Sequence, residues 1–210
     1  MKAVLFDLDD TLFDHQYCSQ SGLAALQQEH AGLRQKTVVE LQHDHLRLLN
    51  ETHAQVMQGV LSPEEARVER FRRLFAQCGE NVSAATLDDV TQRYRQAYEA
   101  ARRLVPGAIP LLQALRSFKI KIAVVTNNFA AEQRDKLQYC GLASLVDTLI
   151  ISEEVGVEKP DPAILSRPEL GPVWPQSCGH GRRFVAGGYS GRSPGRHSSG
   201  LAESLRSCLP

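Results

Sequence analysis

The stretch Asp7-Leu8-Asp9-Asp10-Thr11 decides the fold, because it follows directly on the apolar run Ala3-Val4-Leu5-Phe6. A short apolar run that ends in carboxylates predicts a buried strand over residues 3–7 that opens onto a polar site. Burying a carboxylate is costly unless a cation or hydrogen-bond donors meet it. We therefore favour a metal site or a chemical role for these acids over an exposed strand end that is merely acidic.

Further along the chain, strand-like and helix-like segments alternate. Residues 119–125 and 148–151 are predicted as strands, and residues 130–140 between them as a helix that ends at Gly141. This order is typical of a parallel sheet with right-handed crossovers. We therefore expect an α/β protein with a three-layer, Rossmann-like core.

Each predicted strand runs into polar residues at its carboxyl end. The first delivers Asp7 and Asp9, the second Thr126 and Asn127, and the segment after the third reaches Lys159. A parallel sheet places its site beyond the carboxyl ends of its strands. We therefore expect these side chains to surround one pocket of the size of a phosphate group.

The segment between the first strand and the rest of the sheet is predicted to be helical throughout, over about residues 14–104. Ser62-Pro63-Glu64-Glu65 predicts a helix start, with Ser62 as N-cap, proline at the first helical position and Glu65 closing a capping box. A second helix is expected to open near Thr86. An all-helical insert in an α/β core follows from this pattern.

Composition excludes several classes of protein. The 210 residues carry 24 basic and 24 acidic side chains, and this zero formal net charge argues against nucleic acid as a partner. The five scattered cysteines show no spacing typical of a zinc site or a disulfide framework, which favours a reduced, cytoplasmic compartment. No apolar stretch is long enough to cross a membrane, and the early first strand leads us to expect no signal peptide.

Two acids, a hydroxyl and a lysine suit phosphoryl transfer, which depends on positioning and on neutralising charge. One carboxylate can act as nucleophile, and a second acid two residues on can protonate the leaving oxygen and then activate water. A magnesium ion could bridge carboxylate and phosphate oxygens. Thr126 could hold the phosphate and Lys159 could neutralise its equatorial oxygens.

These residues resemble motifs one, two and three of the haloacid dehalogenase-like hydrolases. The matching stretches are Phe6-Asp7-Leu8-Asp9-Asp10-Thr11-Leu12, Val125-Thr126-Asn127-Asn128 and Glu158-Lys159-Pro160-Asp161-Pro162. The resemblance covers roughly residues 1–165. It implies a hydrolase core over 1–13 and 105–165, with 14–104 as the helical cap of the phosphatase branch.

The resemblance also implies roles for single residues. Asp7 would be the nucleophile and a magnesium ligand, and Asp9 would be the acid and base and a metal ligand through its backbone carbonyl. Thr126 would bind phosphate with help from the Asn127 backbone, and Lys159 would neutralise charge. The expected substrate is a small phosphorylated metabolite, hydrolysed through an aspartyl phosphate by a monomer or homodimer.

The end of the chain departs from the family pattern. The family has a fourth strand that ends in one or two acids and completes the magnesium site, but this sequence has no aspartate after Asp161. Residues 166–210 are rich in Gly, Ser, Pro and Arg and lack an amphipathic period. We interpret them as a disordered or frameshifted tail. A resequenced gene with no open, acid-bearing alternative frame there would contradict the frameshift.

Three alternatives remain. The first is a catalytically impaired or dead relative that only binds phosphate ligands or a partner. The second is a signalling receiver domain, which the long helical insert disfavours. The third is a dehalogenase of the same superfamily, whose nucleophile motif usually lacks the second acid that Asp9 supplies here.

Overall fold

The computed structural model describes residues 3–165. The chain divides into two compact units: a helical unit formed by His15–Arg102, and a sheet unit formed by the chain on either side of that segment. The expectations for residues 166–210, including the missing fourth strand, lie outside the described residues. None of the helices described is long and apolar enough to span a membrane.

The sheet unit contains a parallel sheet of three described strands, β1 (Ala3–Phe6), β2 (Lys121–Thr126) and β3 (Thr148–Ile151), in the order β1-β2-β3. Phe6 lies opposite Val124, and Thr126 lies opposite Ile151, so the carboxyl ends of all three strands meet at one edge. The predicted parallel α/β sheet is confirmed. The strand β2 begins two residues later than predicted and runs one residue further.

The strand β2 is apolar on both sides because both of its faces are covered. Ile122, Ala123 and Val124 have no exposed surface, as expected for the middle strand of a parallel sheet with helices on its faces. On one face the strands pack against residues of the last described segment. This cluster consists of Leu5, Ala123, Val125, Ile150 and Ile164.

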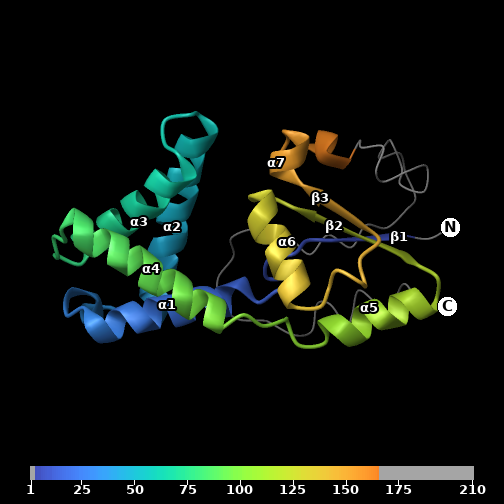
Figure 1. Ribbon diagram of the computed structural model, residues 1–210, viewed down its shortest axis with the longest axis horizontal. Helices are drawn as coiled ribbons and strands as arrows, with labels where there is room; N and C mark the ends of the chain where they lie inside the picture. The colour runs from blue at the N-terminus through green and yellow to red at the C-terminus, as the bar shows by residue number, and fades with distance from the viewer. Residues whose placement is uncertain (1–2, 166–210) are drawn as a thin grey trace. The chain divides into compact units, whose positions relative to one another are not determined.

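Three helices accompany the sheet: α5 (Ala108–Ser117), α6 (Ala130–Tyr139) and the short α7 (Ser152–Val155) (Figure 1). The helix α6 ends as predicted, with Gly141 in the left-handed region at φ 69°. The helix α7 was not predicted, because four residues are too few to show a helical period. A 3-10 turn over Pro162–Leu165 follows.

The helical unit contains α1 (His15–Glu29), α2 (Val38–Met57), α3 (Pro63–Gln77) and α4 (Ala84–Ala100), with a 3-10 turn η1 at Gly32–Gln35. The helix α1 packs along α4, and α2 packs along α3 (Figure 1). One apolar cluster joins them, and its fully buried members are Leu23, Leu26, Leu33, Leu41, Leu74 and Phe75.

The predicted start was correct for helix α3 and misplaced for helix α4. Ser62 caps α3, and its side chain and that of Glu65 form the predicted capping box. For α4 the predicted start at Thr86 was wrong. Ser83 is the N-cap, and its hydroxyl accepts the N–H of Thr86 at 3.2 Å, so the helix begins earlier because Ala84 and Ala85 are good helix formers.

The helices α1 and α4 approach each other closely at Gly22. A Cβ atom at Gly22 would lie 2.6 Å from two ring atoms of Tyr94 and 3.1 Å from its carbonyl oxygen. The ring cannot retreat easily, because its hydroxyl donates to Ser19 Oγ at 3.1 Å and the ring packs against Phe71 in a tilted arrangement, with the ring centres 5.0 Å apart. Glycine is therefore required at this contact.

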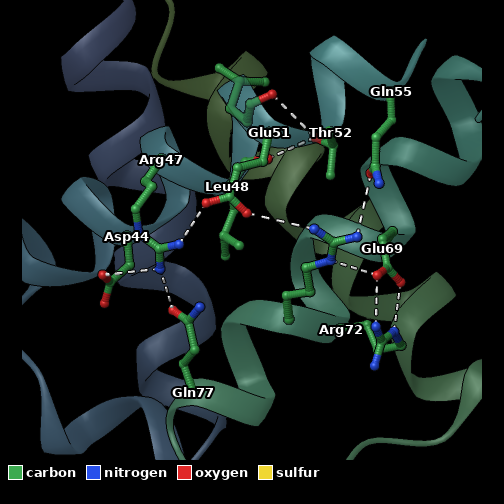
Figure 2. A network of polar contacts seen from close by, with 11 residues as sticks. Asp44, Arg47, Leu48, Glu51, Thr52, Gln55, Glu69, Arg72 and Gln77 are labelled. Atoms are coloured by element: carbon green, nitrogen blue, oxygen red, sulfur yellow. Dashed lines mark hydrogen bonds and ion pairs between the residues drawn. The ribbon is translucent and has the colours of Figure 1, made fainter. Parts of the chain in front are cut away.

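A polar network joins α2 to α3 along their exposed sides (Figure 2). Glu69 of α3 accepts hydrogen bonds from Arg72 and from Arg73, each at 2.6 Å. Arg73 also lies 3.6 Å from Glu51 of α2. The hydrogen bonds from Arg72, and after them those from Arg73, lower the pKa of Glu69 to about 2, against the opposing effect of partial burial.

The helical segment leaves and rejoins the sheet unit at neighbouring residues. The N–H of Asp14 donates to the carbonyl of Arg103 at 3.1 Å, and the Arg103 guanidinium lies 2.7 Å from the Asp14 carboxylate. One step further, the N–H of Val105 donates to the carbonyl of Leu12 at 2.9 Å. The two crossings of the chain are thus held side by side.

Candidate active site

The turn after β1 fixes the two acids of the first motif. The carbonyl oxygen of Leu8 accepts the N–H groups of Leu12 and Phe13, at 2.9 and 3.0 Å. This tight turn follows Asp7 and contains Asp9, so both carboxylates project from an ordered backbone at the carboxyl edge of the sheet. Their side chains are about one-fifth exposed, which leaves them reachable from solvent.

Asp7 pairs directly with Lys159. The Lys159 ammonium lies 2.7 Å from Asp7 Oδ1 and donates to the carbonyl of Val125 at 2.9 Å. Asp7 Oδ1 also accepts the N–H of Leu8 at 2.7 Å. Within residues 3–165, Asp7 Oδ2 accepts no hydrogen bond. One oxygen is thus fixed by the protein, while the other has no hydrogen bond within the described part of the chain.

The side chain of Asn127 holds the segment that carries Lys159. Its Nδ2 donates to the Lys159 carbonyl at 2.9 Å, and its Oδ1 accepts the Lys159 N–H at 2.8 Å. The resemblance had implied only a role for the Asn127 backbone. This pair of hydrogen bonds is a second role, which fastens the carboxyl end of β2 to a segment 32 residues further along.

Thr126 and Asp9 are joined by a residue that sequence reasoning missed. Gln133 Nε2 donates to Thr126 Oγ1 at 2.7 Å and to Asp9 Oδ2 at 3.0 Å. Lys136, one turn further along α6, lies 2.8 Å from Asp9 Oδ1. Gln133 and Lys136 are both buried, so a polar face of α6 packs against the site.

The structure brings all five predicted site residues, Asp7, Asp9, Thr126, Asn127 and Lys159, to the carboxyl edge of the sheet. It connects them through two groups of contacts. Lys159 links Asp7 to β2, and Gln133 links Asp9 to Thr126. The roles of the five residues stay predictions, which the proposals below take up.

The loop between β2 and α6 is also anchored from α7, the short helix that follows the third strand. The N–H of Asn128 donates to Ser152 Oγ at 3.1 Å, and the N–H of Ala130 donates to the Glu153 carboxylate at 2.7 Å. A carboxylate at this position suits the positive end of a helix dipole. The start of α6 is therefore fixed, and with it the positions of its buried polar side chains.

The oxygen donors at this edge fit a magnesium ion. Magnesium is bound by hard oxygen atoms, commonly one or two carboxylates together with phosphate oxygens and water. The Asp7 carboxylate oxygen that does not attack the substrate and the backbone carbonyl of Asp9 would supply such atoms. Within residues 3–165 no group of three or more His, Cys, Asp or Glu side chains could hold a metal. Oxygen atoms of a phosphate group and of water are ligands that commonly accompany a carboxylate on magnesium.

A family model of haloacid dehalogenase-like hydrolases matches residues 1–167. The chain belongs to this family. The match covers all of the described residues, including the three motifs and the helical segment between the first and second of them.

Two curated relatives of this family carry phosphatase names. A glyceraldehyde 3-phosphate phosphatase of Methanopyrus kandleri is 30% identical over 165 residues, which cover 78% of this chain and 67% of the relative. A ribulose-1,5-bisphosphate 5-phosphatase of Halopiger xanaduensis is 31% identical over 172 residues, which cover 79% and 69%.

Solved structures confirm the fold. The hydrolase YfnB of Bacillus subtilis, solved with magnesium bound, is similar with a TM-score of 0.56 at 24% sequence identity. The similarity covers 78% of this chain and 68% of YfnB. At this identity the likeness establishes the architecture, a Rossmann-like α/β fold, and leaves the reaction to be argued from the site.

Proposed function

We propose that this protein is a magnesium-dependent phosphatase that hydrolyses a small phosphorylated metabolite through an aspartyl-phosphate intermediate. The observation that carries the proposal is the Asp7 carboxylate, which has Oδ1 fixed by Lys159 and Leu8 and Oδ2 without a hydrogen bond from the described residues. The phosphatase names of two relatives, which act on phosphorylated sugars and trioses by those names, support it.

In the first step, an oxygen of Asp7 attacks the phosphorus atom and the bond from phosphorus to the leaving oxygen breaks. Asp9 supplies the proton that the leaving oxygen requires. Thr126 donates a hydrogen bond to a phosphate oxygen, and Lys159 places its positive charge beside the same group. These residues align the reacting atoms and offset the negative charge that builds up on the phosphoryl oxygens.

In the second step, a water molecule attacks the phosphorus atom of the aspartyl phosphate. Asp9, now ionised, takes a proton from this water. The bond between phosphorus and the Asp7 oxygen breaks, which releases inorganic phosphate and restores both carboxyl groups. A bound magnesium ion would offset the charge shared by Asp7 and the phosphate.

A catalytically impaired relative that only binds phosphate ligands is the second candidate. The specific observation in its favour is the absence of any aspartate after Asp161, where the family carries the acids of its fourth motif. The pairing of Asp7 with Lys159 and of Asp9 with Lys136 would be equally compatible with a protein that binds an anion without turning it over.

Turnover of a generic aryl phosphate in the presence of magnesium distinguishes the two candidates. We expect the wild-type chain to release phosphate and Asp7→Asn to lose at least about 1,000-fold of that rate, because the amide is a far weaker nucleophile. Asp88→Asn, at an exposed position of α4, is the matched control and should turn over normally. Equal rates for wild type and Asp7→Asn would refute the phosphatase proposal.

The substrate is to be identified by a screen over sugar phosphates, nucleotides and glycolate-type phosphates. The two curated relatives lead us to expect the highest kcat/KM within the sugar phosphates. The screen is run on wild type and Asp7→Asn in parallel, so that only turnover that depends on Asp7 is counted.

A further inference from the structure

The buried face of α6 is polar where an apolar one would be expected. Gln133 has no exposed surface and Lys136 is 4% exposed. The two residues lie three positions apart and therefore project from the same side of the helix. Burying an amide and an ammonium group is unfavourable unless both are hydrogen-bonded, so the partners of these two side chains indicate what they are for.

Lys136 is directed at the second acid of the first motif. Its ammonium donates to both carboxylate oxygens of Asp9, at 2.8 and 3.0 Å. The same ammonium lies 5.2 Å from the centre of the Phe13 ring. A cation that contacts both oxygens fixes the rotation of the carboxylate as well as its position.

Gln133 connects the acid to the hydroxyl that would hold the phosphate. Its Nε2 group donates to Asp9 and to Thr126, and lies 3.2 Å from the carbonyl of Asn127. Because the Thr126 hydroxyl accepts from Gln133, its own hydrogen remains available for donation. The present acceptor of that hydrogen is the Asn127 carbonyl at 3.4 Å, a long hydrogen bond that a phosphate oxygen could replace.

The Oε1 atom of Gln133 indicates that this residue has a functional role beyond stabilising the fold. This atom is buried and accepts no hydrogen bond from the described residues. A buried acceptor without a donor destabilises a fold, and this cost opposes the stabilisation that the Nε2 hydrogen bonds to Asp9 and Thr126 provide. The amide is therefore retained for what its Nε2 group contacts.

We propose that Gln133 and Lys136 are positioning residues for phosphoryl transfer, which hold the Asp9 carboxylate and the Thr126 hydroxyl in register with one phosphate. This inference rests on the proposed function. The two residues act from behind the site and do not contact the substrate. A carboxylate oxygen accepts along two lone-pair directions, so a contact with α6 is compatible with proton exchange between Asp9 and a substrate oxygen.

The test compares full-length variants in magnesium-dependent turnover of an aryl phosphate. We expect Gln133→Met and Lys136→Met to lower kcat roughly 100-fold, since misplaced groups impair chemistry more than binding. KM should change less than about threefold in Lys136→Met and rise no more than about tenfold in Gln133→Met, which also frees the Thr126 hydroxyl from its donor. Lys136→Arg keeps a cation that can meet both oxygens, and should recover at least about tenfold of the loss. Gln138→Met and Arg134→Met, at exposed positions of α6, are the matched controls.

Two measurements separate positioning from folding. Gln133→Met should still unfold cooperatively and melt close to the wild-type temperature, because removal of an unsatisfied buried acceptor offsets the loss of the hydrogen bonds to Asp9 and Thr126. A Lys136→Arg variant that folds but is as slow as Lys136→Met would overturn the role of the cation. The controls should keep a kcat within about twofold of wild type. A methionine variant whose kcat falls in that range would refute the positioning role of the residue that it replaces.

Binding of inorganic phosphate, measured by calorimetry, tests the Gln133 contact without turnover. Gln133→Met should weaken binding by about the same factor as Thr126→Ala, roughly 5- to 10-fold for one lost hydrogen bond, whereas Gln138→Met should bind like wild type. A wild-type chain without Asp7-dependent turnover refutes the proposed function but leaves this comparison intact. Wild-type affinity in Gln133→Met would refute the role of Gln133.

Discussion

Asn127 illustrates how one side chain at a strand end controls a distant segment. Its amide makes two hydrogen bonds with the backbone of Lys159, one as donor and one as acceptor. Lys159 in turn contacts Asp7 at 2.7 Å. The position of the lysine charge beside the candidate nucleophile therefore depends on an asparagine that itself contacts neither the Asp7 carboxylate nor, by our proposal, the substrate through its side chain.

Replacing Asn127 by alanine should destabilise the folded protein. We expect Asn127→Ala to lower the free energy of unfolding by about 1–3 kcal/mol, because two hydrogen bonds are lost and the Lys159 N–H and C=O are left without these partners. Urea denaturation measures this change. Asn50→Ala, at an exposed position of α2, should change it by no more than about 0.5 kcal/mol, and an equal effect of both variants would contradict the prediction.

Among the candidate site residues, those at the strand ends could be predicted from the sequence, whereas those on helix α6 could not. Asp7 and Thr126 were predictable because polar residues that directly follow apolar runs are conspicuous, and parallel strands bring their carboxyl ends together. Gln133 and Lys136 were not, because a polar residue on a helix normally indicates its solvent-facing side. The detectable signal was that the apolar stripe of α6 is too narrow, with Leu137 its main buried apolar side chain.

The contact between helices α1 and α4 depends on glycine at position 22, where no side chain fits. Gly22→Ala should lower the free energy of unfolding by about 1–3 kcal/mol, because the added methyl group would overlap the anchored Tyr94 ring. The control is Ser21→Ala on the same helix, which should be near neutral or stabilising because alanine is the better helix former. Thermal denaturation of both variants tests this prediction. An unchanged melting temperature in Gly22→Ala would show that α1 and α4 can move apart enough to accommodate a methyl group.

The network between α2 and α3 should make stability depend on pH in acid. The pKa of Glu69 is lowered from 4.5 to about 2 in the folded protein by its hydrogen bonds with Arg72 and then Arg73. A lowered folded-state pKa adds stability that is complete above the unfolded-state value and is lost as the pH falls from about 4.5 through about 2. Because the Glu69 side chain is about one-fifth exposed and Arg72 lies at the surface, solvent screens the pair and we expect this contribution to be only about 1 kcal/mol.

The variant Glu69→Gln tests this expectation. Its free energy of unfolding, measured in urea, should lie below that of wild type at pH 7 and approach it as the pH is lowered through the interval given above. Glu64→Gln, at an exposed position of the same helix, should differ little from wild type throughout. A difference between wild type and Glu69→Gln that is the same in neutral and acidic solution would contradict the prediction.

The elements themselves were predictable to different degrees. The strand over residues 148–151 and the capping box at Ser62 were found from local chemistry alone, and the structure confirms both. The start of α4 was misplaced because Ser83 and Thr86 are both acceptable caps, and the sequence does not show which hydroxyl meets a free N–H. The helix α7 follows β3 without a turn signal, so no local pattern separated them.

For the whole molecule, metal removal is the most direct test of the proposed reaction. We expect a chelator to lower turnover of an aryl phosphate at least about 100-fold and added magnesium to restore it, because Asp7 and the phosphate are both anionic and need a shared cation. Asp7→Asn should stay inactive after magnesium is added. Undiminished turnover in excess chelator would contradict a role for the metal.

The function of the helical unit is harder to predict from the sequence than its secondary structure. The alternation of strands and helices indicated a helical insert in an α/β core, and the structure contains a helical unit over His15–Arg102. Its role as a cap over the substrate stays a prediction. Such a cap would contact the substrate through individual side chains, and no general sequence pattern relates those side chains to a particular substrate.

The pairing of Asp14 with Arg103 has a consequence for how such a protein can diversify. The inserted segment leaves and rejoins the sheet unit at adjacent, hydrogen-bonded backbone positions. A different helical segment could therefore replace it if its two ends lie equally close together. Replacement of the whole inserted segment would then leave Asp7, Asp9, Thr126 and Lys159 unchanged. On the prediction that the helical unit selects the substrate, specificity would change in one exchange of that segment, without stepwise changes to the proposed catalytic residues.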